Sequence, residues 1–246
     1  MMLTDEQYLR YNKHILLKDI GEQGQINITK WHAIIIGLGG LGCPLSQYLT
    51  ASGIGKITLI DFDIIELGNL QRQILYTTED IKKFKVHVAK KKLHQLNPNV
   101  KIHAITKPIQ QVDLPSLLSN DTIIIDCSDN IKSKQYSNAF CRQHKIPFII
   151  GSAINMTGQI MSFNFMNNAS PCYQCIYPFK EDKQQYNCQN SGVLSPLLGI
   201  IGSYLAAYVL QIICNQHIFN ELLQIDCLSL QQLKVKIQRS SQCYHQ

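Results

Sequence analysis

Hydrophobic and polar positions along the chain alternate with two different periods, and their order predicts the fold class. Short apolar runs, typical of buried strands, occur at "HAIII", "KITLI", "VKIHAI", "DTIIID" and "IPFII", all before residue 152. Segments with the helical spacing of apolar residues separate these runs. Strands that alternate with helices are typical of an α/β fold with an open, mostly parallel sheet flanked by helices.

The predicted helices and the later strands suggest how the chain is organised. Helical patterns cover residues 5–17, 43–53, 83–96, 131–144 and 192–216. After residue 152 the pattern changes, because "GQIMSFNF" alternates like an antiparallel strand and "LQIDCLSLQQLKVKI" indicates two paired strands. We expect one domain, 1–246, with an N-terminal helical arm (1–28), a nucleotide-binding half (29–152) and a half with a C-terminal antiparallel sheet (153–246).

The segment 192–216 carries no charge and is long enough to span a bilayer. Ser195 and Pro196 form a helix start signal, and the small residues of the segment suit packing against protein. No cationic side chain flanks the segment closely, so we expect a buried helix and no membrane contact. The charged N-terminus is unlike a secretory signal, and nine cysteines, an odd number, argue against a disulfide scaffold. The sequence therefore predicts a cytoplasmic protein.

Positive charge is concentrated in one part of the chain. The net charge is +6, and lysines gather in "IKKFKVHVAKKKLHQLNP". A solvated helix face explains such a run, and a basic rim for an anionic ligand is the sharper interpretation. Aromatic residues do not alternate with the lysines as nucleic-acid binding would favour, so no nucleic acid is expected as a partner.

A glycine-rich motif follows the first predicted strand. "GLGGLG" begins at Gly37, which permits a tight turn, while Gly39 lets the backbone approach a phosphate and Gly42 lets a helix pack on the strand. A strand precedes the motif, a helix follows it, and Asp61 ends the next strand, where its carboxylate can accept from a ribose hydroxyl. Together these features predict a Rossmann-type nucleotide site, although a glycine turn needed only for packing would show the same letters.

The segment after Asp61 carries polar and cationic residues suited to a triphosphate. "GNLQRQ" holds Asn69, Arg72 and Gln73, and Lys85 follows at the start of a predicted helix. Arginine and lysine beside a mononucleotide would neutralise the charge that builds up during phosphorus chemistry. This pattern favours ATP over the NAD of a dehydrogenase, and ordinary surface charge is the plainer interpretation of Arg72 and Lys85.

The fourth predicted strand ends in acids. "DCSDN" places Asp126 and Asp129 beyond the carboxyl end of a strand, where an open sheet holds its ligand. A carboxylate there suits Mg²⁺ bound to phosphates. Asp129 could instead cap the helix that begins near Asn130, and the two roles are compatible.

Cysteines form two further features. Cys172 and Cys175 make a Cys-x-x-Cys pair in "SPCYQC", which suits metal binding, and zinc would need further ligands elsewhere because it usually takes four. A redox role for the pair is less favoured, because the pair does not open a helix after a strand. Cys188 lies in the hydrophilic stretch "KEDKQQYNCQNSG", which predicts an exposed thiol that is either reactive or incidental.

The order of these motifs resembles that of one known family. "RYNKHILL", "GLGGLG", "LIDFD", "NLQRQILYTTEDI", "DCSDN", "CYQC" and "NCQNSGVLSPLLGIIGS" follow one another as in the sulfur-carrier adenylyltransferases of the ThiF/MoeB family, bacterial relatives of ubiquitin-activating enzymes. The resemblance covers nearly the whole chain, and the combination of motifs makes it specific. "QRQILYTTEDI" and "YNCQNSG" look more like the thiamine branch, ThiF, than the molybdopterin branch, MoeB.

This resemblance implies a reaction and its partners. It implies that the C-terminal glycine carboxylate of a ubiquitin-like sulfur carrier, similar to ThiS, attacks the α-phosphate of MgATP and yields an acyl-adenylate and pyrophosphate. It also implies sulfur transfer involving Cys188 in thiamine thiazole biosynthesis, with a cysteine desulfurase or a rhodanese-type protein as sulfur donor. A homodimer is the implied assembly, and 153–246 is the implied carrier-binding half.

The resemblance assigns roles to single residues as well. The positions that match ATP-binding and phosphate-binding residues of the family are Gly40, Asp61, Asn69, Arg72 and Lys85. Asp129 matches the magnesium-associated aspartate, with Asn130 beside it. Lys13 stands where many relatives supply an arginine across the dimer to the phosphates, and it keeps the charge but loses the bidentate fork.

For the cysteine pair, the resemblance implies a structural zinc that a second Cys-x-x-Cys near the C-terminus completes. Cys243 matches the first cysteine of that pair, and His245 is the nearby substitute for the second, because Gln246 is not a usual ligand. Three alternatives remain, namely zinc bound by Cys172, Cys175, Cys243 and His245, zinc with water as the fourth ligand, and no zinc.

Rival functions also remain. A MoeB-type adenylyltransferase is the nearest alternative to the thiamine branch. An NAD-dependent Rossmann oxidoreductase fits the glycine motif and Asp61 but makes little use of Arg72 and Lys85. A binding protein that has lost the chemistry would not need Arg72, Lys85 and Asp129.

Overall fold

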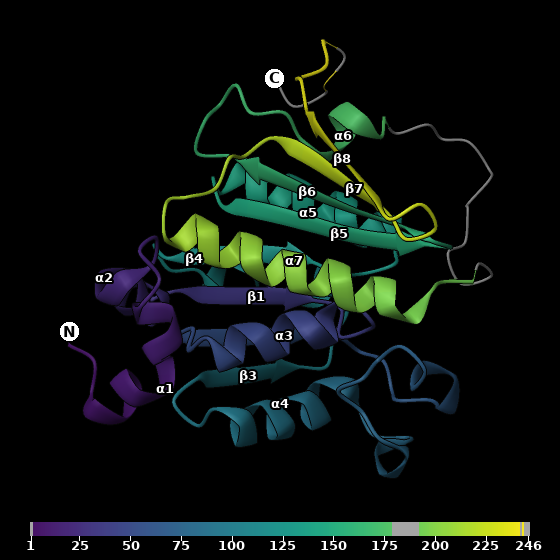
Figure 1. Cartoon of the computed structure of the whole chain (residues 1–246). Helices are drawn as coiled ribbons and strands as arrows, with labels where there is room; N and C mark the ends of the chain where they lie inside the picture. Colours follow the sequence, from purple (N-terminus) through teal and green to yellow (C-terminus); the bar gives the residue numbers. More distant parts are fainter. Residues whose placement is uncertain (1, 179–191, 242, 244–246) are drawn as a thin grey trace.

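The computed structural model describes residues 2–178, 192–241 and 243, and one mixed eight-stranded sheet runs through the middle of the molecule (Figure 1). The sheet order is β3-β2-β1-β4-β5-β6-β7-β8. The parallel strands are β1 (His32–Ile36), β2 (Lys56–Ile60), β3 (Lys101–Ile105), β4 (Thr122–Asp126) and β5 (Pro147–Ile154). The antiparallel strands are β6 (Thr157–Asn164), β7 (Glu221–Asp226) and β8 (Gln231–Lys236).

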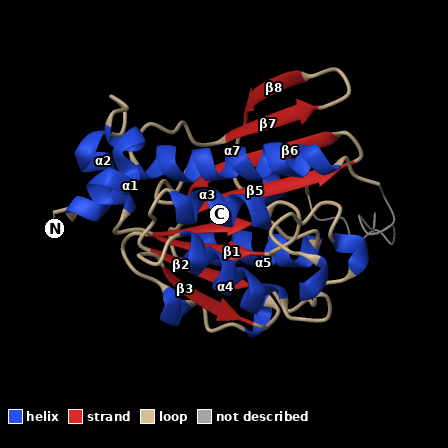
Figure 2. Ribbon diagram, turned by 60° about the horizontal axis from the view of Figure 1, so that its bottom comes forward, coloured by secondary structure: helices blue, strands red, loops and turns tan. Residues whose placement is uncertain are grey.

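The predicted α/β class and the C-terminal antiparallel strands are confirmed. The antiparallel strands extend the parallel sheet, because β6 pairs with β5 along eight residues of register. Figure 2 shows β6, β7 and β8 continuing the sheet beyond β5. The two halves expected from the sequence therefore share one sheet.

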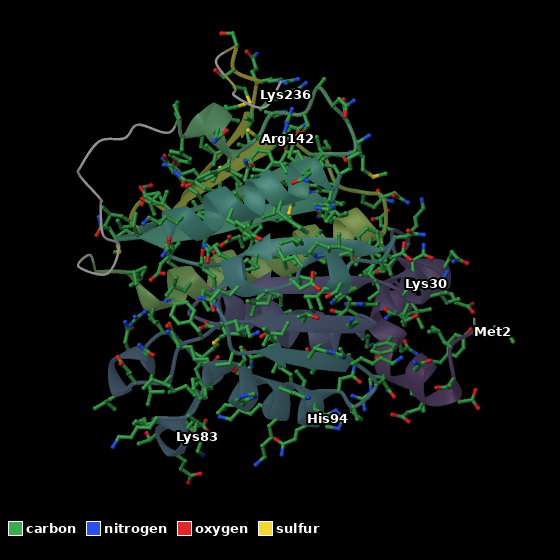
Figure 3. The ribbon with its side chains drawn as sticks, turned by 180° about the vertical axis from the view of Figure 1, so that it is seen from behind. Met2, Lys30, Lys83, His94, Arg142 and Lys236 are labelled. Atoms are coloured by element: carbon green, nitrogen blue, oxygen red, sulfur yellow. The ribbon has the colours of Figure 1, made fainter. Side chains whose placement is uncertain are left out.

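Helices cover both faces of the sheet. They are α1 (Asp5–Ile15), α2 (Gly21–Ile28), α3 (Gly42–Ala51), α4 (Lys85–Leu96), α5 (Ile131–Gln143), α6 (Tyr173–Ile176) and α7 (Ser195–Ile213). Figure 1 shows α3, α4 and α7 on one face, and Figure 3 shows α5 on the other. Thr4 and Gln7 form a capping box that starts α1, and the Asn130 side chain caps α5 by accepting from two backbone amides.

The core divides into two layers because successive strand residues point to opposite faces. In β1, Ala33 and Ile35 pack with α3, α4 and α7, whereas Ile34 and Ile36 pack on the α5 side. Every residue of β1 is buried. A central parallel strand covered on both faces reads as a continuous apolar run, which is why "HAIII" was recognisable in the sequence.

Helix α7 is the uncharged segment of bilayer length. It is long and apolar enough to cross a membrane by composition, and 56% of its most apolar window is buried inside the described structure. Its Gly202 lies so close to α3 that an added Cβ would come 2.4 Å from Pro44 Cγ. Close packing between α7, α3 and the sheet therefore accounts for the apolar sequence, as the small residues predicted.

The strand order reverses between β1 and β4, whose following helices α3 and α5 lie on opposite faces. Open α/β sheets hold ligands beyond the carboxyl ends of the strands at such a switch point. The glycine motif follows β1, Asp61 follows β2 and "DCSDN" follows β4, so the fold brings these motifs to one edge of the sheet.

Candidate functional site

The glycine turn after β1 needs glycine at its two ends. Gly37 has a φ of +88°, in the left-handed region, and an added Cβ would lie 3.0 Å from the backbone carbon of Cys127 at the end of β4. A Cβ on Gly42 would lie 2.1 Å from the Gly37 carbonyl oxygen, which the first turn of α3 approaches. The turn is therefore closed against itself and against the neighbouring strand.

The two inner glycines have different surroundings. A Cβ on Gly39 would meet only Gln73 Nε2, at 3.7 Å, which leaves its backbone open to a ligand. A Cβ on Gly40 would lie 2.6 Å from Leu198 Cδ1 on α7. Gly39 therefore fits the close approach of a phosphate, whereas the space at Gly40 is taken by α7.

Asp61 ties the end of β2 to the glycine turn. Its Oδ2 accepts from the Leu38 amide at 2.6 Å, and its Oδ1 accepts from the Asp63 amide at 2.8 Å. A carboxylate has about four acceptor sites, so those that remain can receive hydroxyl groups of a ribose. Burial raises the pKa of Asp61, and the nearby Lys85 ammonium opposes that shift. The Tyr76 hydroxyl donates to the Leu38 carbonyl at 3.0 Å and gives the glycine turn a second side-chain contact.

Lys85 is a buried cation at the first position of α4. Its side chain is 6% exposed, and its Nζ lies 2.8 Å from Asp63 Oδ2, a half-exposed carboxylate. The pair keeps an ammonium beside the glycine turn without leaving a buried charge unpaired. Sequence reasoning missed Asp63, although its place two residues after Asp61 in "LIDFD" was a signal.

The turn after the short helix at Leu67–Asn69 carries the remaining polar candidates. Asn69 Oδ1 accepts from the Glu66 amide at 3.2 Å, so this oxygen shapes the turn itself. Arg72 is half-buried and donates through Nη1 to the Gly68 carbonyl at 2.8 Å, which leaves most of its five N–H groups for a ligand. Gln73 is 4% exposed, and no partner of its Oε1 is found in the described part of the chain.

The turn that carries Arg72 is held by the start of α7. Ser195 Oγ donates to the carbonyl of Gln71, the residue before Arg72. Together with Leu198 against Gly40, this bond joins α7 to two loops of the nucleotide site. The two contacts connect segments more than a hundred residues apart, and no local pattern in the sequence signalled them.

The acidic end of β4 has an internal and an external carboxylate. Asp126 is fully buried and accepts from Ser128 and Ser137, and Lys134 Nζ lies 3.6 Å from it. Asp129 is exposed on the turn that this network organises. The cap of α5 is Asn130, whose Oδ1 accepts from the amides of residues 132 and 133, so capping makes no demand on Asp129.

These residues fit a nucleotide with a divalent cation. The open backbone at Gly39 leaves room for a phosphate chain, and the Gln73 amide beside it carries N–H groups that can donate to phosphate oxygens. Lys85 and Arg72 supply positive charge on the β2 side, and Asp129 supplies a free carboxylate on the β4 side, a ligand type that Mg²⁺ prefers. Binding of a triphosphate and stabilisation of charge on phosphorus is the chemistry that this arrangement supports.

Lys13 is not brought to this site within one chain. Helix α1 lies beside the amino-terminal ends of the strands, and the site lies beyond their carboxyl ends (Figure 1). Tyr11 of α1 packs against Gly53, in the loop that leads into β2. The exposed Lys13 can reach phosphates only in a second copy of the chain, as the expected dimer would require.

The structure also brings three cysteines together, at the antiparallel end of the sheet. Cys172 Sγ lies 3.9 Å from Cys175 Sγ and 3.6 Å from Cys243 Sγ, and all three sulfurs lie within 4.8 Å of one another. Sulfurs bound tetrahedrally to zinc at about 2.3 Å lie about 3.8 Å apart, so the spacing fits zinc. Burial, and then the neighbouring Cys175, raises the pKa of the Cys172 thiol to about 12. Cys188 and His245 lie outside the described residues.

Comparison with known proteins matches residues 11–245 to the ThiF family. The molybdopterin-synthase adenylyltransferase of Escherichia coli K12 is 33% identical over 243 residues, which cover 98% of this chain and 97% of the relative. The sulfur carrier protein ThiS adenylyltransferase of the same organism is 34% identical over 242 residues, which cover 98% and 96%. The crystal structure of E. coli MccB with MccA-N7isoASN shares the fold, with a TM-score of 0.82 at 22% identity, over 96% of this chain and 73% of that one.

Proposed function

The chain belongs to the ThiF family, and on that premise we propose that it is an adenylyltransferase that activates the C-terminal glycine carboxylate of a ubiquitin-like sulfur carrier. One observation carries the proposal. The glycine turn, Asp61 and the buried Lys85 with its partner Asp63 meet the Asp126–Asp129 turn across the switch point of the sheet. The cations Lys85 and Arg72, and an Asp129 carboxylate that would hold Mg²⁺, suit a reaction between two anions.

The reaction requires the protein to position the two reacting anions and to neutralise the charge on the phosphate oxygens. A carboxylate is already a nucleophile, so its attack on the α-phosphorus of ATP requires no general base, and pyrophosphate leaves. Lys85 and Arg72 offset the charge that grows on the phosphate oxygens, and the backbone at Gly39 and the Gln73 amide orient the chain of phosphates. Asp61 receives the ribose hydroxyls and fixes the other end of the nucleotide.

Two metals belong to the proposal. Asp129, with Asn130 beside it, would hold Mg²⁺ on the phosphates, and the ion would supply further neutralisation there. Cys172, Cys175 and Cys243 would hold a structural zinc, because their sulfur spacing suits it. This cluster lies between α6 and the C-terminus, away from the carboxyl ends of β1 and β2, so its proposed role is to clip the tail to the sheet (Figure 1).

We assign the chain to the thiamine branch, with a ThiS-like carrier. The motifs "QRQILYTTEDI" and "YNCQNSG" support that branch. A molybdopterin-branch enzyme is the second candidate, because relatives from that branch share 33–36% of residues over nearly the whole chain. Sulfur transfer after adenylation would use Cys188 and a donor of the cysteine desulfurase or rhodanese type. Lys13 acting across a homodimer and a cytoplasmic location complete the proposal.

An exchange assay with two carriers tests this function. The purified protein, MgATP and radiolabelled pyrophosphate would be mixed with a ThiS-like carrier or with a carrier of the molybdopterin branch, each with and without its terminal glycine. We expect exchange into ATP with the intact ThiS-like carrier and none with the truncated form. Exchange only with the molybdopterin-branch carrier would move the protein to that branch. Stabilisation by NADH and not by MgATP in a thermal-shift assay would overturn the nucleotide assignment.

A further inference from the structure

A cavity lies at the opposite edge of the sheet from the nucleotide site. It measures about 360 Å³ and is lined by the start of α1 and by the loops that lead into β1, β2 and β3. Lys30, Lys56 and Lys101 line it, and its described lining includes no Asp or Glu. Figure 3 labels Met2 and Lys30, which lie near each other on this edge. The volume is in the range of small-molecule sites.

Two of the lysines stand next to each other on neighbouring strands. Lys56 and Lys101 are register partners at the starts of β2 and β3, where parallel strands run about 4.8 Å apart. Like charges in such positions repel and destabilise a sheet. Within the described ranges, no carboxylate oxygen lies within 4.0 Å of either amine. The pair carries a repulsion that a bound anion would relieve.

The positive charge of Lys56 also lowers the pKa values of two neighbouring histidines. His32 is the register partner of Lys56 on the other side, in β1. Burial, and then the charge of Lys56, lowers the pKa of His32 to about 4, and the same two causes in the same order lower that of His103 in β3. The Lys56 ammonium therefore lies close enough to both imidazoles to disfavour their protonation.

The other residues that line the cavity include both apolar and polar side chains. Met2 and Leu3 are apolar, while Gln7 and Asn99 offer side-chain amides. Three ammonium groups suit a multiply charged anion, and lysine binds phosphate as a point charge. Leu3 is buried and Met2 is exposed beside the cations, and these two apolar side chains suit a ligand with an organic part as well as a charged one.

We propose that this cavity binds a small phosphate monoester, with its phosphate among Lys30, Lys56 and Lys101 and its organic part against Met2 and Leu3. The site is separate from the nucleotide site, because the strand from Lys56 to Asp61 is about 17 Å long at 3.3 Å per residue. The proposal does not depend on the adenylyltransferase function. Since α1 forms part of the lining, an occupied cavity ties the N-terminal arm to the sheet.

Thermal unfolding with glycerol phosphate as the probe tests the proposal. Every sample would hold Mg²⁺ and a saturating non-hydrolysable ATP analogue, so that the nucleotide site is filled, and sodium chloride at matched ionic strength would be the salt control. The test variant is Lys56→Gln/Lys101→Gln. The matched control is Lys90→Gln/Lys91→Gln, which removes the same charge from exposed positions of α4.

For the wild type and the control we expect glycerol phosphate at tenfold its Kd to raise Tm by about 3–6 °C. The test variant should lose this rise, and without ligand it should melt no lower than the wild type, because the repulsion is gone. Citrate in place of the ester shows whether carboxylates compete. An equal rise in the test variant, or the same rise with chloride alone, would overturn the proposal. If the double variant does not fold, Lys101→Gln alone should weaken binding at least about fivefold.

Discussion

The contact between Gly40 and Leu198 predicts a stability defect that a second substitution relieves. A Cβ at residue 40 would lie 2.6 Å from Leu198 Cδ1, closer than carbon atoms approach in folded proteins, and 3.2 Å from its Cγ, which is a tight contact. Leu198 is buried in α7, so its displacement would disturb packed neighbours. Overpacking of this kind costs about 1–3 kcal/mol, and we expect Gly40→Ala to lower the free energy of unfolding by that amount.

Shortening Leu198 should relieve the clash that Gly40→Ala introduces. Leu198→Ala alone leaves a cavity and costs about 2–5 kcal/mol. In the double variant the new methyl group occupies part of that cavity and meets no leucine. The double variant should therefore lose less than the sum of the single losses by about 1–3 kcal/mol, the overpacking cost that it avoids.

Urea unfolding measures these free energies, with the single tryptophan, Trp31, as the fluorescent probe. Gly199→Ala is the matched control, because it adds the same methyl group to α7 where nothing lies within 4 Å. This control should be unchanged or more stable by about 0.5–1 kcal/mol, as an alanine is in a helix interior. Gly40→Ala with wild-type stability, or strictly additive losses in the double variant, would refute the packing argument.

Three further predictions concern other parts of the molecule. Burial lowers the pKa of His32 and His217 from 6.5 to about 4, so only the unfolded chain takes up these protons between those values, and stability should fall as pH drops through that window. His217→Gln should flatten this loss in urea midpoints, and an unchanged pH slope would contradict the assignment. Cys172→Ser should lower bound zinc and Tm together, and a metal-free wild type would show that the cluster holds none. Ser195→Ala removes the hydrogen bond to the Gln71 carbonyl and should weaken ATP binding about fivefold, measured by calorimetry, with nearly unchanged Tm. Equal ATP affinity would show that this bond does not support the Arg72 turn.

The sequence predicted most of the sheet because the central strands are buried on both faces. The apolar runs "HAIII" and "KITLI" became β1 and β2, and β2 ends at Ile60, before the acids that were expected to end the strand. Gly53 was expected to close the helix between these strands, and it lies just after α3 with a φ of +78°. The pairing of β5 with β6 was beyond reach, because alternation indicates a strand but does not say which edge it joins. The helix at Gly21–Ile28 was predicted only as part of an arm.

The candidate site was predictable where its residues follow strand ends. Asp61 and Asp129 could be placed there, because carboxyl ends of neighbouring parallel strands meet at one edge. The contacts of Lys85 with Asp63 and of Gly40 with Leu198 could not be predicted, because each joins segments that are distant in sequence. Asp126 looked like a second ligand in the sequence, and in the structure it is a buried acceptor for Ser128 and Ser137.

We propose that Arg72 and its neighbours activate a carrier carboxylate with ATP, and pyrophosphate exchange by the wild type and two variants measures this activation. With the carrier present, the wild type should exchange radiolabelled pyrophosphate into ATP. Arg72→Ala should lose exchange, because the guanidinium no longer offsets charge on the phosphates. Cys188→Ala should exchange like the wild type, because sulfur transfer follows adenylation. Undiminished exchange in Arg72→Ala, or its loss in Cys188→Ala, would show that the roles assigned to Arg72 and Cys188 are wrong.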